Sequence, residues 1–127
     1  MKQLNITLGE LYNIRTSLIR HDVVSLEFSR KGGLSVARNL KKIDDELSEY
    51  TKERDALIKK YSEDGTSMSK DNPNWEAFVS EYDELNSVES SFEINTITED
   101  DLPNNCSPAL CLALDFMIEE APEVIVE

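Results

Sequence analysis

Apolar residues recur at helical spacing near the start of the chain. The first group falls on one face of a helix: Leu8, Leu11, Ile14 and Leu18. Thr7 and Glu10 have the spacing of a capping box, in which the threonine hydroxyl accepts a hydrogen bond from the backbone three residues on. The pattern therefore predicts a helix from Thr7 to about Arg20. The alternation of apolar and polar residues over 1–6 predicts a short edge strand before it.

The longest periodic stretch follows Gly32 and Gly33. Its positions are spaced alternately four and three apart: Val36, Leu40, Ile43, Leu47, Tyr50, Arg54, Leu57 and Tyr61. This heptad spacing predicts a helix from about Leu34 to Ser62, roughly 43 Å long, with a seam that another element must cover. The helix is predicted to start only after the glycine pair, because glycine disfavours a helix interior.

A second seam-bearing helix is predicted over about 74–89, beyond a polar loop over 63–73. Its seam contains four large residues: Trp75, Phe78, Tyr82 and Leu85. Two such helices joined by one polar loop are expected to pair antiparallel as a helical hairpin.

The remaining segments predict a small sheet and a final helix. Phe92, Ile94 and, less regularly, Ile97 alternate with polar residues and predict a strand that pairs with residues 1–6. Residues 23–28 fit either a second short strand or a buried connector, and residues 98–102 resemble one helical turn.

Ser107 and Pro108 stand in the preferred order for a helix cap and first turn, so a last helix is predicted to run to about Glu120. It is apolar nearly all round and is expected to be the most enclosed element. Val124–Val126 fit an added edge strand, although fraying is the expected state of the tail.

Together these segments predict a mostly helical α+β fold. It consists of a long antiparallel helical hairpin, two further helices and a small antiparallel sheet. Residues 1–120 are expected to form one domain, and residues 121–127 a C-terminal tail.

Charge is distributed very unevenly along the 127 residues. Residues 1–70 hold all 13 basic residues and 11 acidic ones, whereas residues 71–127 hold 15 acidic residues and no base, giving a net charge of −13. Such a segment repels nucleic acid and anionic lipid and attracts basic protein surfaces. We identify six acids as candidate partner-binding residues: Glu76, Glu81, Asp83, Glu84, Glu89 and Glu93. The competing interpretation, that these acids only keep the protein in solution, stays open.

The sequence offers little for catalysis. His21 is the only histidine, and no Gly-x-Ser-x-Gly motif is present. Cys106 and Cys111 lack Cys-x-x-Cys spacing and, five apart in a predicted helix, are expected on different faces as reduced thiols. Glu99–Asp101 lacks the order of an EF-hand loop. We therefore expect no catalytic residues, no metal site and no cofactor.

One segment is a candidate anion site. Arg30, Lys31, Gly32 and Gly33 combine two cations and two glycines before a predicted helix N-terminus, an arrangement that can hold a phosphate or carboxylate of a partner. The segment lacks the Walker pattern, and ordinary solvated charges are the competing interpretation.

Several segments in this order resemble small uncharacterised proteins of tailed bacteriophages and prophages. The matching segments cover most of the chain: Thr7–Leu11, Glu53–Tyr61, Ala77–Leu85, Ile97–Leu102, Ser107–Leu110 and Phe116–Glu120. The Arg30–Gly33 stretch departs from that pattern. The resemblance implies a phage context and assigns no activity or site residue.

We therefore expect a non-enzymatic phage-encoded accessory protein in the host cytoplasm that binds a protein partner with a basic surface. Inhibition of a host factor for defence or nucleic-acid handling is the first hypothesis. The alternative is a structural or assembly component of the virion, in which the helical seam and the terminal strand support a homo-oligomer. Neither hypothesis involves direct contact with nucleic acid or a membrane.

Overall fold

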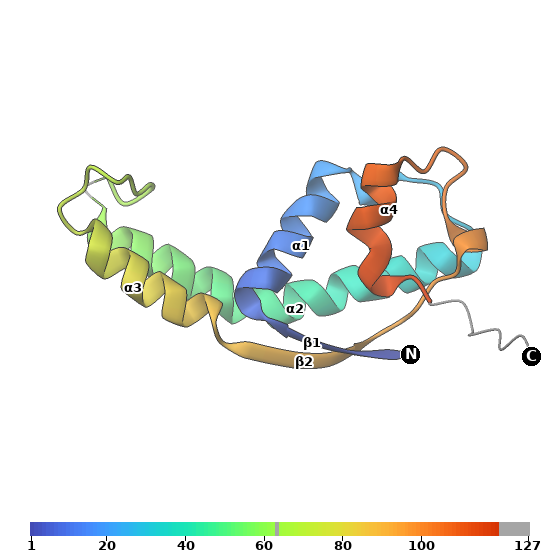
Figure 1. Cartoon of the computed structure of the whole chain (residues 1–127), viewed down its shortest axis with the longest axis horizontal. Helices are drawn as coiled ribbons and strands as arrows, with labels where there is room; N and C mark the ends of the chain where they lie inside the picture. The colour runs from blue at the N-terminus through green and yellow to red at the C-terminus, as the bar shows by residue number, and fades with distance from the viewer. Residues whose placement is uncertain (63, 120–127) are drawn as a thin grey trace, which may run out of the picture.

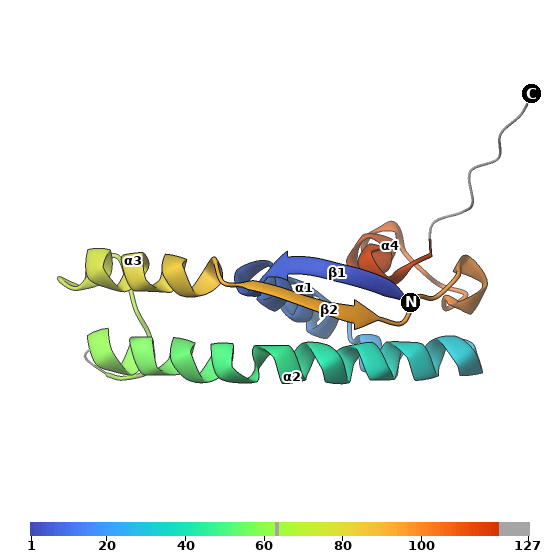
Figure 2. The same cartoon turned by 90° about the horizontal axis from the view of Figure 1, so that it is seen from below.

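One long helix runs the length of the molecule, and the other elements pack along it (Figures 1 and 2). The computed structural model describes residues 1–62 and 64–119. Its helices and strands are, in chain order, β1 Lys2–Thr7, α1 Leu8–Arg20, α2 Arg30–Tyr61, α3 Trp75–Asn86, β2 Glu89–Ile94 and α4 Pro108–Leu114. Three short 3₁₀ turns accompany them: η1 Val23–Ser25, η2 Glu99–Asp101 and, directly after α4, η3 Asp115–Met117. The mostly helical α+β fold predicted from the sequence is confirmed.

α1 begins with the threonine cap that the sequence predicts. The Thr7 side chain accepts a hydrogen bond from the Glu10 N–H at 3.2 Å. Leu11 and Leu18 are buried, so the predicted apolar face packs inward. Residues 23–28 form no strand. Of the two predicted alternatives, they form the buried connector, in which Val23 of η1 is buried.

The predicted start of the long helix at Leu34 is wrong, because α2 already begins at Arg30. Ser29 caps the helix by accepting a hydrogen bond from the Gly32 N–H at 3.0 Å. The two glycines therefore lie in the capped first turn, where the cap offsets their weak helix propensity. With 32 residues, α2 is about 48 Å long.

The hairpin of α2 and α3 is held by aromatic residues at its distal end. Phe78 lies at 5.5 Å from Tyr82, 5.9 Å from Trp75 and 6.4 Å from Tyr61, measured between ring centroids. Figure 2 shows α3 running alongside the C-terminal half of α2, as the seam pattern predicts.

A two-stranded antiparallel sheet covers the N-terminal half of α2. Lys2 of β1 pairs with Ile94 of β2, and Thr7 pairs with Glu89. Ser90 and Ile94 are buried on the inner face, whereas Glu89, Ser91 and Glu93 are exposed on the outer face. The predicted pairing of the two segments is confirmed, although Ile97 lies beyond the strand and forms an isolated parallel bridge with Ile118.

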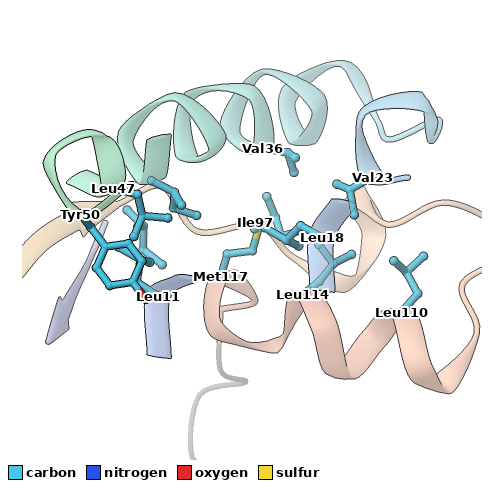
Figure 3. Packing of buried hydrophobic residues seen from close by; sticks show 12 residues of the cluster. Leu11, Leu18, Val23, Val36, Leu47, Tyr50, Ile97, Leu110, Leu114 and Met117 are labelled. Atoms are coloured by element: carbon cyan, nitrogen blue, oxygen red, sulfur yellow. The ribbon is translucent and has the colours of Figure 1, made fainter. Parts of the chain in front are cut away.

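The hydrophobic core lies between α1, α4, the sheet and the N-terminal two-thirds of α2 (Figure 3). It contains Leu11, Leu18, Val23, Val36, Ile43, Leu47, Tyr50, Ile94, Ile97, Leu110, Leu114 and Met117. Phe78 is buried but lies outside this cluster, whereas Leu85 near the end of the same helix packs against it.

Asn39 is a fully buried polar residue within this core. Its side chain donates to the Asn95 carbonyl and accepts from the Asn95 N–H, each at 2.7 Å. The amide thus completes the backbone hydrogen bonding of the chain where it leaves β2, which removes the cost of burying unpaired polar groups.

The last helix is shorter and less enclosed than predicted. It ends at Leu114, where η3 begins, because residues 117–119 leave the helix to bond with Ile97 on both sides. Leu114 is fully buried, but Leu112 remains 79% exposed. The predicted tail over 121–127, including Val124–Val126, lies outside the described residues.

Candidate protein-binding surface

Three of the six predicted acids form the acidic face of α3: Glu76, Asp83 and Glu84, all exposed. The inward side of the helix is fixed by Phe78, whose ring packs between the two helices, and 3.6-residue periodicity turns these acids away from it. Within residues 1–62 and 64–119, no base lies within ion-pairing distance of the three carboxylates. The acidic face of α3 therefore presents uncompensated charge to solvent.

Glu81 differs from these three because it is partnered inside the hairpin. Its carboxylate lies 3.3 Å from Nζ of Lys60 on α2, and Lys60 also stacks on the Tyr61 ring at 4.9 Å. The Tyr61 hydroxyl, followed by Lys60, lowers the pKa of Glu81. Glu81 is therefore better placed to join α2 to α3 than to meet a partner.

Glu89 and Glu93 lie on the outer face of the sheet, where their side chains are exposed. Ser91 lies between them and is hydrogen-bonded to Gln3 and Asn5 of β1. Figure 1 shows β2 following directly from the end of α3. Glu89 therefore lies three residues past the end of α3, whereas Glu93 lies four residues farther along the strand.

At the start of α2, a carboxylate of the chain itself, that of Asp101, lies beside the candidate anion site and is bound by the neighbouring Ser29. Asp101 accepts a hydrogen bond from the Ser29 hydroxyl, and the Ser29 N–H donates to the Asp101 carbonyl at 3.1 Å. A Cβ placed on Gly32 would lie 2.6 Å from Asp101 Cβ, so only glycine permits this approach. Gly33 has no comparable contact.

Hydrogen bonds stabilise the ionised form of Asp101. The Ser29 hydroxyl, the Thr98 backbone N–H and, more weakly, the charge of Lys31 lower the pKa of this carboxyl. Asp101 also completes a capping box with Thr98 at the start of η2. The cluster therefore joins two segments about 70 residues apart in sequence, and Arg30 remains exposed beside it.

A polar cluster connects α1, α2 and the end of α3. The buried Tyr50 hydroxyl donates to Asn86 at 2.6 Å and lies 3.3 Å from the Tyr82 hydroxyl. Arg54 lies over the Tyr12 ring at 5.4 Å and donates to Tyr82 at 3.4 Å. Burial, reinforced by Tyr82, raises the pKa of Tyr50, which stays protonated. Arg54, a polar residue in the predicted seam, is thus accommodated by aromatic and hydroxyl partners.

An apolar cavity of about 180 Å³ lies between the end of α1, η1 and α2. Ile19 and Val24 at its edge are 61% and 80% exposed, and the Arg15–Asp44 ion pair crosses its side. Asp22, which also lines it, has a positive φ of 49° because it follows the last turn of α1. The periodic apolar positions of the sequence give no sign of this cavity, since Ile19 and Val24 fall outside them.

The cysteines and His21 show how the cap positions decide side-chain placement. The expectation that Cys106 and Cys111 lie on different faces is wrong: their Sγ atoms are 2.9 Å apart. Cys106 precedes α4 rather than belonging to it, so helical phase does not apply to the pair.

His21 follows α1 as its C-cap residue, and its N–H donates to the Ser17 carbonyl at 3.1 Å. Among the described residues, no three His, Cys, Asp or Glu side chains are grouped as metal ligands would be.

Comparison with protein-family models, curated proteins and solved structures finds no match to this chain. None of the helices in the described ranges has the length and apolar character needed to cross a bilayer.

Proposed function

We propose that this protein is a non-enzymatic phage accessory protein that binds a basic surface of a protein partner through the acidic face of α3. The exposure of Glu76, Asp83 and Glu84 without a base beside them in the described chain carries the proposal. Glu89 and Glu93 extend the same negative field over the adjoining sheet. Unpaired carboxylates of this kind accelerate encounter with cationic surfaces.

The support of α3 adds to this proposal. Phe78 anchors the helix on Tyr61 of α2, and Lys60 pairs with Glu81 on its flank. A helix held in this way presents its charges at fixed spacing, which reduces the entropy lost on binding. A host factor whose basic surface normally holds nucleic acid is the expected partner, because spaced carboxylates meet the same cationic groups as phosphates.

Affinity capture from phage-infected cells tests this function. Three baits are compared: the wild-type chain, a variant with Glu76, Asp83 and Glu84 changed to Gln, and a control with exposed Asp45, Glu49 and Glu53 of α2 changed to the corresponding amides. Both variants lose three negative charges. A true partner is captured by the wild-type chain and the control, is lost with the α3 variant and is released by salt. Equal capture by all three baits would contradict the proposal.

The second candidate function, a structural or assembly component of the virion, is favoured by the apolar cavity beside Ile19 and Val24. Exposed apolar side chains around a cavity are suited to contacts between subunits. This function predicts copurification with phage particles and a mass above 14.4 kDa that increases with concentration. A monomer at every concentration that is absent from particles would exclude it.

A further inference from the structure

The two cysteines are brought together by the cap of α4. Ser107 caps the helix by accepting a hydrogen bond from the Leu110 N–H at 3.1 Å. Cys106 is thus the residue before the cap, and Cys111 is the fourth residue of the helix. Side chains at these two positions regularly pack together as a hydrophobic staple. Here the staple consists of two free thiols whose Sγ atoms lie 2.9 Å apart.

We propose that Cys106 and Cys111 form a dithiol–disulfide site that exchanges with low-molecular-weight disulfides of the glutathione class. This inference is independent of the partner-binding function. Both side chains are partly exposed, so a small disulfide can reach the pair. A metal is a weaker fit, because the described residues provide no third ligand beside the two sulfurs.

The exchange takes place in two steps that balance. The Cys111 thiolate attacks one sulfur of oxidised glutathione, the disulfide of the oxidant breaks, and one glutathione thiolate leaves and takes up a proton. Cys106 then loses its proton and attacks Sγ of the mixed disulfide on Cys111, which releases a second glutathione. The protein dithiol is oxidised by two electrons, and one glutathione disulfide is reduced to two thiols.

The environment of the two thiols supports this order of attack. Burial, followed by the neighbouring Cys111, raises the pKa of Cys106 to about 11, so Cys106 is protonated at neutral pH. A protonated thiol is a poor first nucleophile. Its contact with Cys111 instead places it to resolve the mixed disulfide, where proximity replaces the need for a high thiolate fraction.

Intact-mass measurement on the full chain tests the proposal. The protein is incubated with oxidised glutathione, remaining thiols are alkylated, and the mass is recorded. We expect a monomer that has lost two hydrogens and carries no alkyl group. Cys106→Ser is expected to stop at one glutathione adduct on Cys111. A wild-type chain that keeps both thiols, or that accumulates only glutathione adducts or intermolecular dimers, would overturn the proposal.

The same reaction in concentrated urea separates the folded site from mere closeness in sequence. At a fixed ratio of oxidised to reduced glutathione, the fraction of internal disulfide is expected to be higher in the native chain than in the unfolded chain. Equal fractions would show that the fold does not build the site, and would overturn the proposal without depending on any variant.

Discussion

Gly32 and Gly33 are neighbours in the first turn of α2, but an added methyl group meets different surroundings at each. At Gly32 it would lie 2.6 Å from Asp101 Cβ, whereas at Gly33 the nearest such atom, in Phe28, is 3.9 Å away. We predict that Gly32→Ala lowers the free energy of unfolding by about 1–3 kcal/mol through overpacking. Gly33→Ala is the matched control and should raise it by about 0.5–1 kcal/mol, because alanine favours the helix. Urea unfolding of both variants provides the comparison, and equal shifts would contradict the close approach of Asp101.

Asp22 is the one non-glycine residue with a positive φ in the described chain. It also places a negative charge just past the C-terminus of α1, where the helix dipole disfavours it. We predict that Asp22→Gly raises the free energy of unfolding by about 0.5–1 kcal/mol and that Asp22→Ala lowers it by a similar amount. Thermal unfolding distinguishes the two. Destabilisation by glycine would mean that the hydrogen bond from Ser25 to Asp22 outweighs the backbone strain.

The proximity of the two cysteines was predictable from residues that the sequence already identifies. Once Ser107 is recognised as a cap, Cys106 and Cys111 occupy the staple positions on either side of the first turn. Cys106 lies outside α4, so the prediction that places both cysteines within one helix puts them on different faces, which is wrong. The contact between Gly32 and Asp101 was not predictable in this way, since it joins two segments that no local pattern relates.

At the scale of elements, the start of α2 is joined to η2 through an ionised carboxylate. The pKa of Asp101 is lowered from its ordinary value of 3.8, chiefly by the Ser29 hydroxyl. The stabilisation is therefore fully present above that ordinary pKa and is lost as the pH falls through the lower pKa of the folded state.

We predict that lowering the pH from about 5 to about 2 destabilises the wild-type chain more than Asp101→Asn. Asp64, whose pKa is lowered to about 2 by the N–H groups of Thr66 and Ser67, is present in both proteins and cancels in the comparison. Urea midpoints across this range provide the measurement. Parallel pH profiles would show that the Asp101 carboxylate contributes nothing to stability.

The distal hairpin is predicted to open separately from the main core. Phe78 packs against Tyr61, Trp75 and Tyr82 and lies outside the main cluster. Phe78→Ala should remove about 3–5 kcal/mol of packing locally. We expect hydrogen exchange to accelerate in α3 and the end of α2 while α1 keeps its protection. Uniform acceleration over the chain would show a single cooperative unit instead.

The sequence predicted the elements that combine strong periodicity with clear caps. The seam of α2, the Thr7 cap of α1 and the strand pairing of 1–6 all follow from local patterns. The end of α4 does not follow from a local pattern, because the residues after it, Met117 and Glu119, bond with Ile97 from another part of the chain. Tertiary contacts of this kind override propensity and leave no local signal.

At the scale of the whole molecule, the uneven distribution of charge along the sequence becomes an uneven distribution of charge over the surface. All 13 basic residues precede Asp71 in the sequence. In the described chain, Lys60 is the base of α2 that forms an ion pair with α3, where its partner is Glu81. The acidic face of α3 was predictable in part, since helical periodicity separates Phe78 from Asp83 and Glu84. The sequence does not predict which acid of α3 pairs with a base of α2, because that depends on the register of the two helices.

The most direct test of the proposed function is the affinity of a captured partner for matched variants at low and moderate salt. For the change of Glu76, Asp83 and Glu84 to amides, we predict that Kd rises about tenfold or more at low salt and that its salt dependence flattens. The α2 control, with Asp45, Glu49 and Glu53 changed, should retain the wild-type Kd. An unchanged Kd for the α3 variant, or the same loss for the control, would contradict binding through the acidic face of α3.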